Sequence, residues 1–490
     1  MRPYGVPVIG LRRVGVLLVL LGALAALLAP AAFAHESTPT GVQRIELDLG
    51  ARELALTITA PPEGGGRMPV VVLPRGDAPP GEVVLAAVRP GGEPANAVPV
   101  PVAPVGQPHE VALTTDGPGA WEITVADGTT TARVPVTVAA PVPTPGWVWA
   151  VRIGALVGVV ALVAALAPSV RRRPRLALGL GAVALVGITI AATAVATAPS
   201  STPTPPAPTP AAAPIIAPPA GGHAGHGGAA PAPTPMTTAT MTSGSVVATA
   251  STTSPPTAGA PTDLALDLTD SSTGAVVDDL AIHDDALIHL AVMGPDGSLD
   301  HVHPVRTAPG HYVVRLTPGT AGRYGVFAEM ERAGDGGHQV ARTAFDVPGP
   351  APAPAAPAPG PGVREVGGMQ VDVAVPEAVA GRPTTVSATF GAGGGQVTDL
   401  QRWLGMAGHL MVLGPGLGGT PDPMDPASAF GHVHDMSAPG PAGTYGPRIS
   451  FEHTFARAGR YQLWVQVQRD WRIVTVPVTV DVTPAPASAP

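Results

Sequence analysis

Two similar segments, "AGRYGVFAEM" at 321–330 and "AGRYQLWVQV" at 458–467, carry the clearest signal for the fold. In each, a Gly-x-Tyr start precedes a largely apolar run, which is typical of a β-strand that begins at a glycine bend and buries its aromatic residue. A fainter version, "PGAWEITVAD", occurs at 118–127. We assign this signal to turn and core formation and expect no catalytic role for it.

Short alternating segments bounded by Gly, Pro and Asp surround each of these signals. They are "RIELDL" and "ELALTITA" near the first, "DLALDLT" and "HYVVRLT" near the second, and "MQVDVAV" and "TTVSATF" near the third. Six to eight such strands in roughly 100 residues predict a β-sandwich of immunoglobulin-like size. We therefore expect three all-β modules: a first module at 35–145, a second at 261–347 and a third at 363–484.

The second and third modules also repeat each other. The segment "ALIHLAVMGPDGSLDHVHPV" in the second is matched by "MAGHLMVLGPGLGG" and "FGHVHDM" in the third, in the same order and with a longer Gly/Pro insertion. Because the matched segments keep the same order despite the insertion in the third module, they indicate two copies of one domain.

Proline and glycine account for 62 and 61 of the 490 residues, too many for a uniformly packed globule. They concentrate at 199–260 and 348–362, which we expect to be disordered Pro/Ala-rich linkers, and a short tail follows at 485–490. The formal charge is −8, and the 27 basic residues are arginines scattered except for one cluster, so nucleic acid is not an expected partner.

The lack of cysteine excludes disulfides and zinc–thiolate, iron–sulfur and blue-copper thiolate sites. Soft-metal chemistry in this chain must therefore use His, Met and carboxylates. The sequence also has no Gly-x-Ser-x-Gly elbow, phosphate-binding loop or dinucleotide fingerprint, so it predicts no enzyme, no catalytic residue and no organic cofactor.

Three apolar runs indicate export and membrane attachment. A basic start, an apolar run and Ala32-Phe33-Ala34 predict a signal peptide at 1–34. The runs at 147–167 and 176–198 flank "RRRPR" at 171–175, which predicts a hairpin of two transmembrane helices at 146–198 with a cytoplasmic basic loop. All three modules would then lie outside the cytoplasm. The alternative is that one run is a buried core helix.

The repeated His-Val-His triplets are the best candidates for a binding site. Residues i and i+2 of a strand project to the same side, so two imidazoles of one triplet can hold one cation, and a third histidine lies upstream in each module. Imidazole suits copper, zinc and nickel, and nearby thioethers favour Cu(I), so copper is the preferred cofactor. The candidate metal ligands are His289, His301 and His303 in the second module, and His409, His432, His434, Met406, Met411 and Met436 in the third. The alternative is a pair of solvated or hydrogen-bonded histidines on each strand.

Other histidines offer weaker signals. His223 and His226 lie in a Gly-rich part of the linker, where they could collect copper loosely or have no role. Cleavage after Ala34 would leave His35 as the first residue, whose amino group and imidazole could form a copper brace together with His109.

The His-rich segments of the second and third modules resemble exported domains found beside bacterial copper-resistance proteins. The first module and the span after it are similar to YtkA-like or FixH-like domains, which occur in metal-handling and oxidase-assembly settings. The resemblance implies association with copper and with such proteins as partners, and it carries over to His289, His301, His303, His409, His432 and His434. The third module departs from the second by Asp435 in place of Pro304 and by its long insertion.

Three hypotheses follow for the function. The first is a membrane-anchored extracytoplasmic protein that sequesters or relays copper, with His for Cu(II) and Met for Cu(I). The second is a structural or adhesive surface protein whose histidines bind no metal, and the third is a copper-dependent redox enzyme that uses the His35 brace. Under the first, we expect each His-containing module to bind one metal separately, and binding to weaken as pH falls through about 6.5, the reference pKa of His.

Overall fold

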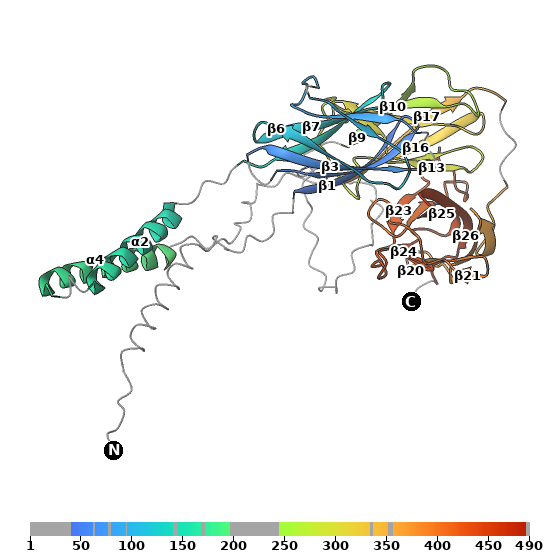
Figure 1. Cartoon of the computed structure of the whole chain (residues 1–490). Helices are drawn as coiled ribbons and strands as arrows, with labels where there is room; N and C mark the ends of the chain where they lie inside the picture. The colour runs from blue at the N-terminus through green and yellow to red at the C-terminus, as the bar shows by residue number, and fades with distance from the viewer. Residues whose placement is uncertain are drawn as a thin grey trace. The chain divides into compact units, whose positions relative to one another are not determined.

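The computed structural model describes residues 41–61, 64–76, 80–94, 96–140, 146–167, 172–196, 245–333, 337–350 and 356–486. The predicted signal peptide, His35, His223 and His226 lie outside these ranges. Within them, all pairs of named strands are antiparallel, and the two helices are confined to one hairpin (Figure 1).

The first module is a sandwich of two four-stranded sheets. One sheet has the order β1 (Val42–Leu49), β2 (Arg52–Thr59), β3 (Gly66–Arg75), β6 (His109–Thr115), and the other has β5 (Val98–Pro101), β4 (Glu82–Val88), β7 (Gly119–Ala126), β8 (Thr131–Val138). Alternate apolar residues of both sheets are buried, as the strand patterns predicted.

The second module pairs a four-stranded sheet with a five-stranded one. The first has the order β14 (Val305–Ala308), β15 (His311–Leu316), β10 (Thr262–Asp270), β9 (Val246–Thr252). The second has β11 (Leu280–Ala281), β16 (Gly322–Arg332), β12 (His289–Met293), β13 (Leu299–Val302), with β17 (Gly337–Val347) beside β16. Strand β9 lies inside the segment expected to be a linker, because a seven-residue "VVATAST" strand is easily overlooked in a Thr/Ser-rich tract.

The third module repeats this arrangement. One sheet has the order β18 (Gly362–Val366), β19 (Met369–Ala374), β20 (Pro383–Ala392), β21 (Gly395–Gln396), with β24 (Arg448–Thr454) beside β20. The other has β23 (Phe430–His434), β22 (His409–Leu413), β25 (Gly459–Arg469), β26 (Arg472–Val482). The prediction of an all-β protein with two helices is thus confirmed at the level of sheets and sandwiches.

The Gly-x-Tyr signal performs the turn and core role expected of it. Gly322 and Gly459 begin β16 and β25 with the same φ of 135°, a conformation that favours glycine. Tyr324 and Tyr461 follow two residues later and are each 1% exposed. Each tyrosine hydroxyl donates a hydrogen bond of 2.9 Å to the carbonyl of the residue four positions earlier, Thr320 for Tyr324 and Arg457 for Tyr461. The aromatic ring therefore anchors the start of its strand to the preceding loop.

The second and third modules are packed against each other. A buried apolar cluster between them contains Ala291, Met293 and Phe327 from the second and Met411, Leu413 and Trp464 from the third. These are matching positions of the two repeats, so each module contributes the same face. The proline-rich linker between the modules does not indicate this interface, because linker composition carries no information about complementary faces.

The first module joins the same body. One continuous hydrophobic core includes Ile45 and Leu56 of the first module and Leu266 and Val314 of the second. The Arg306 guanidinium of the second module donates a 2.9 Å hydrogen bond to Glu122 of the first, and both side chains are buried.

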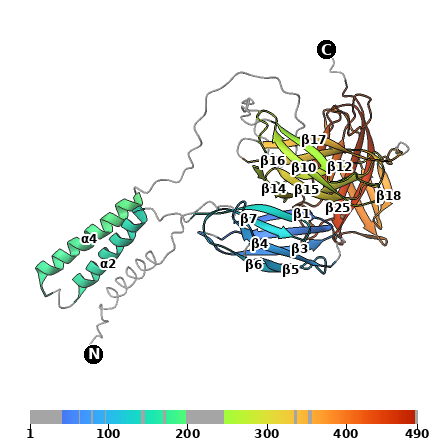
Figure 2. The same ribbon diagram turned by 90° about the horizontal axis from the view of Figure 1, so that it is seen from above.

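Helices α2 (Gly146–Leu166) and α4 (Pro174–Ala196) lie side by side (Figure 2). They approach closely at glycines: a Cβ on Gly187 would lie 2.7 Å from the backbone of Gly154 and Gly158. The segment Trp149–Leu166 is long and apolar enough to cross a membrane, whereas the apolar stretch in α4, Pro174–Ile190, is shorter than that limit.

Candidate metal centre

Strand pairing brings the histidines of each repeat together. In the second module Ala291 lies opposite His301, so His289 and His301 share one face of the sheet, and His303 follows directly after β13. In the third module His409 lies opposite His434, and Met411 lies opposite His432. The upstream histidine and the His-Val-His triplet are therefore on neighbouring strands, as the spacing predicted.

The two sets of histidines form one cluster across the two modules. One ring nitrogen from each of His289, His301 and His303 lies within 4.8 Å of the others, and the same holds for His301, His409 and His432. His301 belongs to both groups. His434 adjoins the second group, with its Nε2 3.2 Å from Nε2 of His432. We call the six residues His289, His301, His303, His409, His432 and His434 the histidine cluster.

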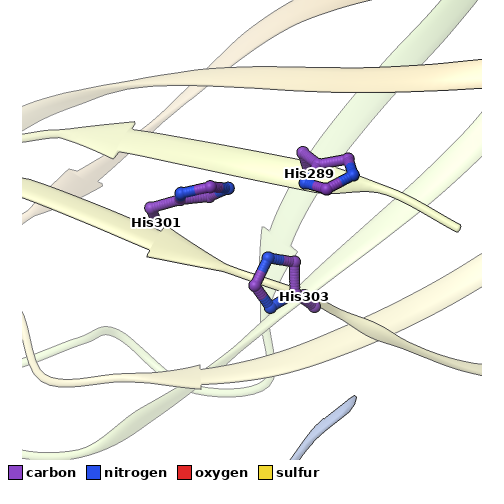
Figure 3. Close-up of side chains that lie close together, drawn as sticks. All are labelled: His289, His301 and His303. Carbon is purple, nitrogen blue, oxygen red and sulfur yellow. The ribbon is translucent and has the colours of Figure 1, made fainter. Parts of the chain in front are cut away.

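The histidines of the second module have ring nitrogens free for a ligand. His289 is 3% exposed, His301 9% and His303 4%, and each has one buried ring nitrogen without a hydrogen-bond partner: Nδ1 of His289 and Nε2 of the other two. Leaving a buried polar atom unpaired costs about 1–3 kcal/mol. Figure 3 shows the three rings close together, from β12 and from the end of β13.

The opposite nitrogen of each of these rings faces a polar partner. Nε2–H of His289 donates a 3.0 Å hydrogen bond to the carbonyl of His283, and Nδ1 of His301 lies 3.1 Å from Oε1 of Gln466 in the third module. Nδ1 of His303 lies 3.6 Å from Oδ2 of Asp48 in the first module. Metal-binding histidines characteristically have such a partner on their second nitrogen, which fixes the orientation of the ring.

The third-module histidines are joined in a buried network. Nε2–H of His409 donates to the carbonyl of Trp403 at 3.2 Å, and Nδ1 of His409 lies 2.9 Å from Nε2 of His432. Nδ1–H of His432 donates to Oε2 of Glu329 in the second module at 2.7 Å. Burial by itself would raise the pKa of Glu329. The interaction with His432 and the hydrogen bond from His338 outweigh burial and hold the pKa of Glu329 well below its usual range.

Burial keeps most of the cluster neutral. Desolvation, followed by the charge of His432, lowers the pKa of His289 to about 4 and that of His434 to about 3. Burial also lowers the pKa of His301, His303 and His409 well below the ordinary value. Neutral imidazole is the metal-binding form. Protons should therefore compete with a metal at a lower pH than the value of about 6.5 expected from the sequence.

Matching turns present the upstream histidines. Residues His283 to Ala286 and Trp403 to Met406 close turns whose central residues all have positive φ: 46° and 61° at Asp284 and Asp285, 47° and 79° at Leu404 and Gly405. These are the angles of type I′ turns. The first residue of each turn supplies the carbonyl that orients His289 or His409, so the two repeats hold this histidine in the same way.

The three predicted methionines lie in different surroundings. Met411 packs in the apolar cluster between the modules, Met406 closes the Trp403 turn, and Met436 is 57% exposed. Among the described residues, the two groups in which three His, Asp or Glu ligand atoms lie within 4.8 Å of one another consist of histidines. Met411 lies opposite His432 on the neighbouring strand, and the role of the methionines as ligands stays a prediction.

Sequence reasoning missed the partners of the histidines: Glu329, Gln466 and Asp48. Glu329 and Gln466 occupy the ninth position of the two repeated "AGRY" segments, opposite His289 and His409 respectively. A polar residue at the same place in an otherwise buried strand of both repeats was the available signal. Asp48 gave no signal, because its link to His303 depends on packing of the first module.

A small cavity adjoins the cluster where the first module meets the other two. It has a volume of about 40 Å³, and its walls include Glu46, Asp48, Glu53, His301 and His303. This is room for a few water molecules. Burial raises the pKa of Glu46 to about 7 although Arg75 pairs with it at 2.8 Å.

Fold and site together define an all-β protein in which two repeated sandwiches share a buried histidine cluster that a third sandwich helps to enclose. Residues 241–348 and 364–484 each match one family model, described as a domain of unknown function (DUF8832). The two matches agree with the repeat seen in the sequence and assign no activity. No curated protein matches the chain significantly.

Similar solved structures include the adhesin FdeC of Escherichia coli, with 12% identity, a TM-score of 0.15, and coverage of 86% of this chain and 94% of the adhesin chain. Another is trypsin-activated alpha-2-macroglobulin from Escherichia coli, with 8% identity and a TM-score of 0.16. That alignment covers 91% of this chain and 24% of the macroglobulin chain. Similarity at these TM-scores supports no argument about fold or function.

Proposed function

We propose that this protein binds a transition-metal ion in the histidine cluster. The observation that carries the proposal is the set of three unpaired, buried ring nitrogens on His289, His301 and His303, with each ring oriented through its other nitrogen. A metal bound at about 2.0–2.1 Å from each nitrogen would draw the rings slightly closer and satisfy all three atoms.

Copper is the proposed ion, and the donor set favours Cu(II). Imidazoles bind copper, zinc and nickel, and among divalent ions the general affinity order peaks at copper. Met411 packs in the apolar cluster between the modules and Met436 is 57% exposed, so the proposed donor set consists of imidazoles and does not favour the reduced ion. Binding of Cu(I) by methionine, which was part of the first hypothesis, is therefore not part of this proposal.

We also propose that the protein works outside the cytoplasm, anchored by the α2–α4 hairpin, and that it sequesters or relays copper there. The apolar segment Trp149–Leu166, the arginine-rich loop and the start of the sequence support this placement. Copper-handling or oxidase-assembly proteins are the partners that the sequence resemblance suggests.

Elemental analysis of the purified full chain in detergent, after supply of copper and zinc and then dialysis, tests the metal proposal. We expect stoichiometric copper in the wild-type protein and its loss in a variant with His289→Gln, His301→Gln and His303→Gln. His311→Gln is the matched control, because His311 is a partly exposed residue paired with Asp267 at 2.7 Å on the other sheet of the same module. Wild-type protein without retained metal would refute the proposal.

The second candidate is a structural or adhesive surface protein without metal. It is favoured by the extent of the contacts between modules, which include the apolar cluster, the Arg306–Glu122 pair and the closed network of His409, His432 and Glu329. Buried polar networks of this kind can fix one arrangement of a protein core. On this reading the wild-type protein retains no metal, and a chelator leaves its thermal unfolding unchanged.

A further inference from the structure

A second group of potential ligands connects the histidine cluster with the surface of the second module. His283, Asp284, Glu331 and His338 form this outer group. Nδ1 of His283 lies 3.1 Å from Oε2 of Glu331, and Nε2 of His283 lies 3.0 Å from Oδ2 of Asp284. The rings of His283 and His338 are 6.2 Å apart.

Exposure falls steadily from the outer group to the cluster. The side chains of Glu331, His283 and His338 are 41%, 35% and 28% exposed. Asp284 and His434 are each 17% exposed, whereas Glu329 and His432 are 3% and 1% exposed. The donors therefore extend from solvent to the interior.

Consecutive members of this series are in contact. Nε2 of His338 lies 2.6 Å from Oε1 of Glu329, whose other oxygen accepts the hydrogen bond from His432. On a parallel branch, Oδ2 of Asp284 lies 3.4 Å from Nδ1 of His434, which in turn contacts His432. Both branches thus join the outer group to the same buried imidazole.

The equivalent position on the other repeat is closed. His283 and Trp403 occupy the first place of the matching turns, and each supplies its carbonyl to the upstream histidine. Trp403 is 3% exposed and covers His409 and His301, with ring centroids 4.6 and 5.0 Å away. One repeat therefore places a partly exposed imidazole where the other places a buried indole.

We infer that the outer group captures a transition-metal cation from solvent and passes it by ligand exchange, through Glu329 and His434, into the histidine cluster. Each station offers imidazole and carboxylate donors, a mixture that holds copper or zinc with water completing the coordination. Stepwise exchange allows the ion to lose its water gradually, which avoids the large cost of burying an unpaired charge. This inference rests on the proposed function.

Rapid mixing of the metal-free full chain with Cu(II) tests the route. Trp403 lies against the cluster, so quenching of tryptophan fluorescence reports arrival of copper there. We expect the double variant His283→Gln/His338→Gln to load at least about tenfold more slowly, a rise of about 1.4 kcal/mol in the barrier to loading, because the imidazoles that capture the ion are removed. Its equilibrium affinity, from competition with a chelator, should equal that of the wild type, so release must slow by the same factor.

Two comparisons make the result specific. His311→Gln, the partly exposed control on the other sheet, should load at the wild-type rate. His283→Asp retains a ligand atom and should load faster than His283→Gln, which a purely structural role for His283 does not predict.

Other outcomes would overturn the inference. Loading of the double variant at the wild-type rate would overturn the proposed route. Slow loading of Asp48→Asn/Glu53→Gln in the same experiment would show that copper enters through the small cavity instead. Loss of affinity with an unchanged loading rate would make the outer residues ligands rather than a route. A wild-type protein that retains no copper would refute the proposed function itself, whereas wild-type rates in the double variant would refute this inference alone.

Discussion

The chemistry of the site depends on individual histidines whose two nitrogens have different surroundings. His303 illustrates this: Nδ1 faces Asp48 of the first module, and the buried Nε2 has no hydrogen-bond partner. Asp48 Oδ2 also accepts the backbone N–H of His303 at 2.5 Å. One carboxylate thereby fixes both the backbone and the ring.

Asp48→Asn should weaken copper binding by about 10- to 100-fold, the usual effect of removing a partner of a metal-binding histidine. Burial raises the pKa of Asp48 well above its usual range. Asparagine can still accept the backbone hydrogen bond, so the change acts mainly on the side-chain group that faces Nδ1 of His303. Competition titration of the full chain measures the affinity. Asp267→Asn, which alters the partner of His311, is the control, and equal affinities in all three proteins would contradict the role given to Asp48.

Stability of the metal-free protein should fall as pH falls from about 6.5 toward 4. The pKa of His289 is lowered from 6.5 to about 4, so the unfolded chain takes up a proton over this interval while the folded chain does not. The stability associated with the neutral ring is therefore present above 6.5 and lost in acid, at about 1.4 kcal/mol per pH unit for each such group.

Urea denaturation at a series of pH values measures this slope. His289→Gln should give a shallower slope than the wild type, because one titrating group has been removed. A wild-type stability that stays constant from pH 6.5 to 4 would show that the buried histidines are not held neutral by the fold.

At the scale of elements, matching strands of the two repeats form the apolar interface that holds the two halves of the histidine cluster together. Phe327 on β16 and Trp464 on β25 occupy the same position of the repeated segment, and both are buried in the apolar cluster. Trp464 also donates a hydrogen bond of 3.3 Å to the carbonyl of Gly297 in the second module. Two residues beyond Trp464, Gln466 contacts His301.

Trp464→Ala should destabilise the protein by about 3–5 kcal/mol, as is usual for removal of a large buried aromatic side chain. It should also weaken copper binding, because His301 is oriented by Gln466 on the same strand. Thermal unfolding and competition titration measure the two effects. Trp471→Ala, on the turn after β25, serves as the comparison. Unchanged copper affinity in the Trp464 variant would show that the apolar interface between the modules does not affect copper binding by the histidine cluster.

The helical hairpin is expected to place its basic loop in the cytoplasm. A reporter fused after Arg173 should be active only in the cytoplasm, and one fused at the end of the chain only outside, since both flanks of the hairpin lie on one side of the membrane. Enzymatic reporters specific for each compartment measure this. Activity of the Arg173 fusion outside the cytoplasm would rule out the hairpin topology.

At the scale of the whole molecule, the histidines of the two His-containing modules lie in one cluster. Gln466 of the third module reaches His301 of the second, and Glu329 of the second reaches His432 of the third. The two contacts join matching positions of the repeats in opposite directions, as in the interface of a symmetric dimer. Separate binding by each module, as expected from the sequence, stays a prediction, and the proposed function replaces it by a shared site.

His301→Gln should consequently reduce copper binding more than His432→Ala combined with His434→Ala, because His301 belongs to both groups of nitrogens. Copper should also stabilise the wild-type protein as a whole, by about 2.7 kcal/mol when free copper is 100 times the dissociation constant. Calorimetric titration and thermal unfolding with and without copper measure these effects. Independent sites would instead give the His301 variant one fully intact binding event.

Local patterns in the sequence determined the strands, the Gly-x-Tyr starts, the repeat and the two helices. Each of these follows from the alternation of side chains along a strand, from a glycine-dependent bend or from the length of an apolar run. The six cluster histidines could also be singled out, because their order, one upstream histidine followed by a His-Val-His triplet, is the same in both repeats.

Only the tertiary structure decided that the two triads form one cluster and that Asp48, Glu329 and Gln466 lie beside its rings. These relations join residues far apart in the chain, from 103 positions between Glu329 and His432 to 255 between Asp48 and His303. They depend on which faces of the sandwiches are complementary. That complementarity is a property of assembled surfaces, so the periodicity of a single strand carries no record of it.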